Sequence, residues 1–143
     1  MLENMKAAFN MAQDEYKIRI NRMRDIDNKL NMLLIATSAL FLIVKDASSF
    51  YLKMILMFLL VVTSILILIG LYPKSYSLIS IKPMIKGEIF SKTEQEHMQY
   101  WFENINKAIE KIEKTMKIKI MLTNISTIIL SFSFFGVFIG FII

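Results

Sequence analysis

The sequence contains no cysteine and a single histidine, His97. Without cysteine the chain cannot form disulfide bonds or a cysteine-rich metal site, and one histidine cannot build a histidine cluster. Only four glycines and two prolines occur in 143 residues, and none of them belongs to a phosphate-binding loop or a nucleophile-elbow motif. We therefore predict a protein that is not an enzyme and that holds no metal or cofactor.

Charge is missing from three stretches of the sequence, namely residues 30–44, 54–73 and 120–143. A helix needs about 20 residues to cross the hydrocarbon core of a bilayer, and the second and third stretches reach that length. The first is shorter, and it can cross if Lys29 and Lys45 extend toward the headgroups or if the bilayer thins. A buried hairpin in a soluble protein would explain the first two stretches, but the third is apolar on all sides. The sequence thus predicts an all-α membrane protein with about three transmembrane helices.

The positive charges are distributed unevenly between these stretches. Residues 1–29 hold six lysines and arginines, residues 45–53 hold two, and residues 74–119 hold nine. Because positively charged segments stay on the cytoplasmic side, we predict a cytoplasmic N-terminus and an outward-facing C-terminus in a bacterial inner membrane. The predicted segments are a cytoplasmic amphipathic helix (1–29), a transmembrane hairpin (30–73, with spans 30–44 and 54–73), a cytoplasmic linker and helix (74–119), and a third span (120–143).

Both cytoplasmic segments show the periodicity of helical stems. In the second stem apolar residues recur at alternating steps of four and three, which favours a helix that packs on another helix over one that lies flat on the membrane surface. This apolar seam consists of Met98, Phe102, Ile105, Ile109, Ile112 and Met116. We expect Ser91 or Thr93 to cap this helix and Glu113 to pair with Lys117 on its solvated face. Since neither proline nor glycine interrupts residues 1–44, the first stem should run directly into the first span.

Small residues line one face of the last span. Gly136 and Gly140 form a GxxxG motif, and Ser126 and Ser133 lie on the same face of the helix. Because small residues let helices approach closely, this pattern favours helix association. We predict that several copies of the chain associate through this face and through the apolar seam. The residues assigned to this contact are Ser133, Gly136, Gly140, Phe102, Ile105, Ile109 and Ile112.

A charged segment, residues 22–29 (RMRDIDNK), directly precedes the first span. In one interpretation it is a membrane anchor, in which Asp25 and Asp27 pair with nearby basic residues of the same segment. In the other it forms a polar ring at the cytoplasmic mouth of a helical bundle. Lys74, Lys117 and Lys119 would then lie at the same depth and help to hold an anionic ligand or lipid headgroup.

Four short segments together resemble a known family: residues 24–29 (RDIDNK), 33–36 (LLIA), 68–74 (LIGLYPK) and 117–119 (KIK). In their order and placement around the spans they resemble the Pycsar effector transmembrane proteins of bacterial anti-phage defence. The layout is also similar to that of SLATT-type membrane effectors. The resemblance extends over roughly residues 20–143.

The resemblance implies a stand-alone effector that binds a cyclic pyrimidine mononucleotide, oligomerises and damages the inner membrane, so that the infected cell is arrested. A nucleotide phosphate would then need Arg24, Lys29, Lys117 or Lys119, and Asp27 or Asn28 could contact the ribose or base. The expected partners are the lipid bilayer, further copies of the chain and this ligand, but no nucleic acid polymer. A structural or accessory subunit of a membrane complex, or a constitutive holin-like pore, is the alternative function.

Overall fold

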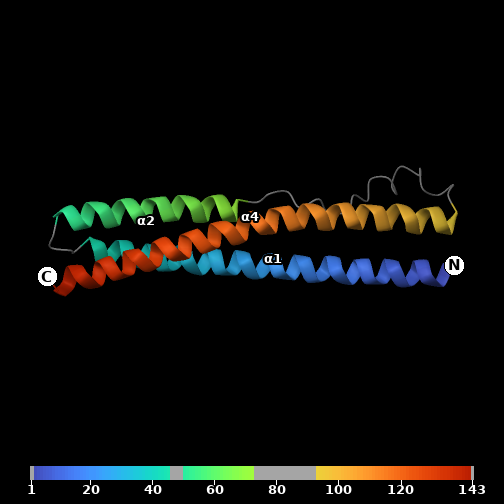
Figure 1. Ribbon diagram of the computed structural model, residues 1–143, viewed down its shortest axis with the longest axis horizontal. Coiled ribbons are helices and arrows are strands. Elements are labelled where there is room, and N and C mark those ends of the chain that lie inside the picture. Colours follow the sequence, from blue (N-terminus) through green and yellow to red (C-terminus); the bar gives the residue numbers. More distant parts are fainter. Residues whose placement is uncertain (1, 46–49, 73–92, 143) are drawn as a thin grey trace. The chain divides into compact units, whose positions relative to one another are not determined.

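The computed structural model describes residues 2–45, 50–72 and 93–142, and they form three α-helices (Figure 1). These are α1 (Leu2–Val44), α2 (Phe50–Leu71) and α4 (Glu94–Ile142). The described part of the chain contains no strand. All three helices are long and apolar enough to cross a membrane. The predicted fold class is confirmed: the chain is an all-α, multi-pass membrane protein.

The sequence explains where the helices begin and end. The helix α1 continues through residue 29 without a break, as expected for a segment that lacks proline and glycine. The helix α2 ends at Leu71, two residues before Pro73, which disfavours helical geometry in the residue that precedes it. At the start of α4 the Thr93 hydroxyl accepts a hydrogen bond from the Glu96 amide, and the Glu96 carboxylate accepts one from the Thr93 amide. This reciprocal capping box confirms Thr93 as the N-cap.

The helix α2 starts at Phe50, four residues before the predicted beginning of the span at Met54. The prediction excluded Lys53 because a charged side chain is costly inside the bilayer. In the structure the Lys53 ammonium group donates a hydrogen bond to the carbonyl oxygen of Lys45, at a distance of 2.6 Å. This contact holds the charge at the C-terminal end of α1, where the helix dipole favours a cation. The predicted break at 73–93 lies outside the described residues, apart from Thr93.

The chain divides into two compact units, and both α1 and α4 contribute to each of them. We call the first the stem unit (Met1–Arg24 and Pro73–Met116) and the second the membrane unit (Asp25–Tyr72 and Lys117–Ile143). In the stem unit Ala12 packs with Ile105 and Ile109, while Phe9 and Tyr16 flank the cluster. The prediction that the second stem helix packs on another helix is thus confirmed, and the partner is α1 of the same chain.

In the membrane unit three helices share a core whose buried residues recur at steps of seven, as in a helical bundle. On each helix the buried set includes a hydroxyl residue or a glycine. The sets are Leu30, Thr37 and Val44 on α1; Leu56, Thr63 and Gly70 on α2; and Lys119, Ser126 and Ser133 on α4.

Contacts at the two ends of this core define how the helices run. Near one end, a Cβ added to Gly70 would lie 3.0 Å from Leu30 and 3.7 Å from Leu122. Near the other end, Leu40 and Val44 pack with Leu56 and Leu60. Within the membrane unit α1 and α4 are therefore parallel, and α2 is antiparallel to both (Figure 1).

The outer surface of the membrane unit is apolar. Tyr51, Phe58 and Phe132 are 81%, 68% and 69% exposed, and many further large apolar side chains of α2 and α4 are also exposed. A soluble protein rarely presents so much contiguous apolar surface to water. Hydrocarbon is the solvent that suits this surface, which agrees with the length of the helices.

Candidate functional site

An ion pair joins α1 to α4 inside the membrane unit. The Lys119 ammonium group donates a hydrogen bond to the Asp27 carboxylate, although the two residues lie 92 positions apart in the sequence. The Lys119 side chain is only 3% exposed, and that of Asp27 is 28% exposed. A buried charge is tolerated only when a partner compensates it, and the Asp27 carboxylate is such a partner for the buried Lys119 ammonium group.

The ion pair lies at the end of the membrane unit that adjoins the charged segment 22–29 in the sequence. Asp27 precedes Leu30 by three residues on α1, and Lys119 precedes Leu122 by three residues on α4. Leu30 and Leu122 both lie against Gly70 of α2. The ion pair is therefore about one helical turn beyond the Leu30 and Leu122 layer, where the apolar core ends.

Of the six residues predicted to bind a ligand, Asp27 and Lys119 form an ion pair in the structure. Lys119 is buried, whereas Lys117 is exposed, because residues two positions apart point to different sides of a helix. For the same reason Asn28 and Lys29 are exposed while Asp27 faces α4. Arg24 is also exposed and belongs to the stem unit. Lys74 lies outside the described residues. A polar mouth made of all these lysines remains a prediction.

The anchor interpretation of residues 22–29 sought the partner of Asp27 among the basic residues of the same segment. The polar-ring interpretation placed Lys119 at the same depth but did not pair it with Asp27, whereas in the structure Lys119 on α4 is that partner. The sequence did contain one signal for the position of Lys119, namely the seven-residue period of the apolar seam. Lys119 follows Ile105 and Ile112 at steps of seven, so the apolar seam itself places a lysine on the packed face of α4.

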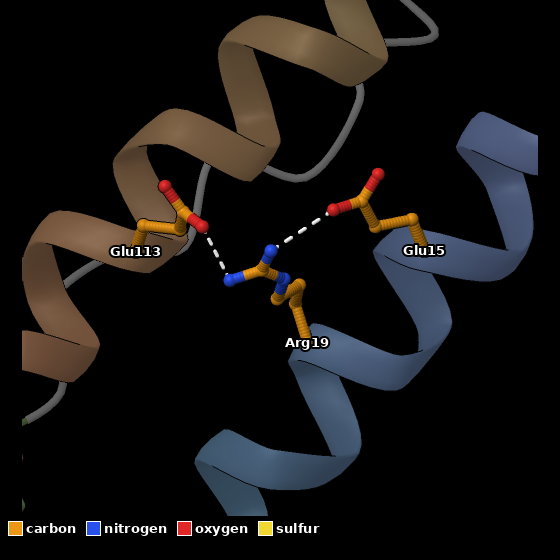
Figure 2. A network of polar contacts seen from close by, with 3 residues as sticks. All are labelled: Glu15, Arg19 and Glu113. Atoms are coloured by element: carbon orange, nitrogen blue, oxygen red, sulfur yellow. Dashed lines mark hydrogen bonds and ion pairs between the residues drawn. The ribbon is translucent and has the colours of Figure 1, made fainter.

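The stem unit contains a second polar network, formed by Glu15, Arg19 and Glu113 (Figure 2). One guanidinium nitrogen of Arg19 donates to the Glu15 carboxylate at 2.9 Å, and the other pairs with Glu113 on α4. The prediction that Glu113 pairs with Lys117 is wrong, because Glu113 points toward α1, where Arg19 reaches it. This bridge crosses from one stem helix to the other beside the Ile105 and Ile109 cluster.

The hydrogen bond to Glu15 and the negative charge of Glu113 raise the pKa of Arg19, although partial burial opposes them. A group whose pKa is raised by folding stabilises the fold at every pH below its unfolded value, and the stabilisation is lost only as the pH rises past the folded value. For an arginine both values lie far above neutrality. The charge of Arg19 is therefore constant under physiological conditions.

Most of the residues assigned to contacts between copies are buried within the chain or lie against other parts of it. A Cβ added to Gly136 would lie 2.7 Å from Leu56, and one added to Gly140 would lie 2.6 Å from Leu52. Ser133 is fully buried, and the isoleucines 105, 109 and 112 are buried as well, while Phe102 is 36% exposed. The association of several copies therefore stays a prediction, and an interface between them would need other surfaces or a rearrangement of this packing.

In the described residues, Asp, Glu and His side chains form no group of three or more that could hold a metal ion. Comparisons of the chain with protein families, with curated proteins and with solved structures give no match.

Proposed function

We propose that the chain is a non-enzymatic membrane effector of bacterial anti-phage defence, which oligomerises and impairs the inner membrane when it senses a cyclic pyrimidine nucleotide. Three features support this proposal: the multi-pass helical fold, the resemblance of residues 24–29 and 117–119 to the Pycsar effectors, and the buried ion pair of Asp27 and Lys119. The last of these is the observation that carries the mechanism.

An ion pair at this position can hold the membrane unit in a resting state. Breaking a buried pair by removing one partner costs about 3–5 kcal/mol, because an uncompensated charge stays behind. A phosphate group could replace Asp27 as the partner of Lys119, since lysine binds phosphate as a point charge. Ligand and carboxylate would then compete for one ammonium group, and the ligand would favour a state in which α1 and α4 separate at this level.

The exposed cations give an anionic ligand a route to this pair. Lys29 and Lys117 are exposed, and each lies two residues from one member of the pair. Their positive charges attract an anionic nucleotide from the aqueous side. With the stems in the cytoplasm, as the distribution of lysine and arginine favours, this side is the compartment in which a nucleotide cyclase acts.

The proposal is tested with the purified chain in liposomes that contain a trapped fluorescent dye. Cyclic UMP or cyclic CMP should release the dye, whereas cyclic AMP should not. Release without any nucleotide would instead support the constitutive pore. If the chain never releases dye and purifies only with a second protein, it is an accessory subunit and the effector proposal is wrong.

Substitution of Asp27 by Asn tests the role of the ion pair. It removes the negative charge that faces the buried Lys119 ammonium group, so we predict a resting state that is less stable by about 3–5 kcal/mol and dye release without nucleotide. Asp25→Asn is the matched control, because Asp25 is exposed and the change in charge is the same. The exchange Asp27→Lys with Lys119→Asp should restore a tight membrane. Equal tightness of Asp27→Asn and the wild type would refute the proposed resting state.

A further inference from the structure

A groove of about 430 Å³ runs between α1 and α4 in the membrane unit. Its lining includes small side chains on both helices, namely Ala36 and Ala39 on α1 and Thr127 and Ser131 on α4, with larger apolar residues beside them. Ala36 and Ala39 are exposed, so α2 does not cover this face of the pair. The groove opens to the surroundings of the membrane unit, which are hydrocarbon at this depth.

The hydroxyl groups in the groove do not require a polar ligand. The Thr127 hydroxyl donates to the carbonyl of Thr123 at 2.8 Å, and the Ser131 hydroxyl donates to the carbonyl of Thr127 at 2.9 Å. Both are therefore satisfied within α4 itself. What remains for an occupant to contact is mainly methyl, methylene and aromatic surface from residues such as Leu40, Ile43 and Phe134. The chemistry of the lining selects an apolar occupant.

Two lysines belong to the part of the membrane unit next to one end of the groove, Lys45 directly after α1 and Lys53 in the first turn of α2. Lys45 follows the lining residue Ile43 by two positions, a rise of about 3 Å along a helix. Lys53 of α2 reaches the same end of α1, because its ammonium group donates to the carbonyl of Lys45. An ammonium group has three donors, so this bond leaves two of those of Lys53 for another acceptor. A negatively charged oxygen at this end would be favoured by both lysines.

From this combination we propose that the membrane unit binds one anionic phospholipid, with an acyl chain in the groove and the headgroup phosphate at Lys45 and Lys53. The volume of about 430 Å³ lies in the range of roughly 300–1,000 Å³ that is usual for sites that hold one small ligand, which agrees with a segment of a single acyl chain. This inference does not depend on nucleotide sensing.

The test is native mass spectrometry of the full chain released from detergent, with phosphatidylglycerol or phosphatidylcholine of equal chain length added. We expect one phosphatidylglycerol per chain, with a preference over phosphatidylcholine of about tenfold or more from two lysines. The double variant Lys45→Gln and Lys53→Gln should keep lipid binding but lose this preference. A wild-type chain that binds neither lipid, or both equally well, would overturn the proposal.

Filling the groove provides the second arm. Ala39→Phe and Ser131→Phe, which introduce an aromatic ring from opposite walls, should each weaken lipid binding about tenfold or more. Leu42→Phe is the matched control, because Leu42 is 72% exposed and does not line the groove. Circular dichroism identifies any variant that has lost its helices. A groove variant that keeps its helices then tests whether lipid binds in the groove. If the groove variants bind lipid normally, or if they dissociate a dimer of the wild-type chain instead, the lipid site is wrong.

Discussion

The polar side chains buried in the membrane unit differ in how their hydrogen-bonding capacity is satisfied. Lys119 has Asp27 as its partner, and the hydroxyls of Thr37 and Thr63 donate to carbonyls of their own helices, at 2.7 and 2.8 Å. The Ser126 hydroxyl is fully buried and has no hydrogen-bond partner among the described residues. An unsatisfied hydroxyl costs free energy in an apolar core, so Ser126 is the least favourable of these residues.

Substitution of Ser126 by Ala should therefore not destabilise the protein. We predict an unchanged free energy of unfolding or an increase of about 1 kcal/mol, because the variant removes an unsatisfied group of similar size. Ser133→Ala is the control: Ser133 is equally buried, but its hydroxyl donates to the carbonyl of Ile129 at 2.9 Å, so this variant should lose a little stability. Thermal unfolding in detergent compares the two. A larger loss for Ser126→Ala would mean that this hydroxyl has a partner, such as a buried water.

Individual contacts were the part of the site that the sequence did not predict. Asp27 has several basic neighbours within one helical turn, and the seven-residue period that places Lys119 on the packed face of α4 does not say which residue of α1 it meets. The preference arises from the packing of α1 on α4, which brings the two side chains together and excludes water from Lys119. The sequence indicated that these charged residues matter, but it did not lead us to predict that Lys119 is buried while Lys117 is exposed.

At the scale of the helices, small residues determine how closely α2 and α4 approach. Gly136 lies against Leu56, which is 2% exposed, and Gly140 lies against Leu52, which is only partly buried. Added Cβ atoms would come within 2.7 Å and 2.6 Å of these leucines, so each leucine would have to move. Leu52 is only partly buried and packs at the edge of a cluster, whereas Leu56 belongs to its buried part together with Leu40, Val44 and Leu60.

This difference predicts that Gly136→Ala is more harmful than Gly140→Ala, although both add one methyl group. We expect Gly136→Ala to cost about 1–3 kcal/mol through overpacking, and Gly140→Ala to cost less. Part of either cost is offset because alanine favours the helix by about 1 kcal/mol over glycine. Unfolding in mixed detergent measures the two variants side by side. The opposite order would show that Leu56 is free to adjust and that the cluster is loosely packed.

Sequence periodicity predicted the helices better than it predicted their partners. The seven-residue spacing of Ile105 and Ile112 predicted the buried face of α4, and both residues are buried. The same spacing cannot say whether the opposing helix belongs to the same chain or to another copy. For Gly136 the opposing helix is α2 of the same chain. The GxxxG motif therefore identified a packed face, while the structure was needed to identify its partner.

At the scale of the whole molecule, the chain combines two units that differ in the surface they present. The membrane unit exposes large apolar residues such as Phe58 and Phe138, whereas the stem unit carries charged side chains such as Asp14, Lys17 and Glu110 on its exposed faces. Hydrocarbon suits the first surface and water suits the second. Both the effector proposal and the lipid site require that the membrane unit crosses the bilayer three times.

The absence of cysteine makes this requirement directly measurable, because single cysteines can be introduced without a competing thiol. Asn10→Cys and Gln99→Cys mark exposed positions on the two stem helices, and Tyr51→Cys marks the exposed start of α2, directly after the link between the first two spans. With a membrane-impermeant thiol reagent, Tyr51→Cys should react in intact spheroplasts, whereas the two stem cysteines should react only after the membrane is permeabilised. Reaction of all three to the same extent in intact spheroplasts would contradict the three-crossing arrangement and the mechanism built on it.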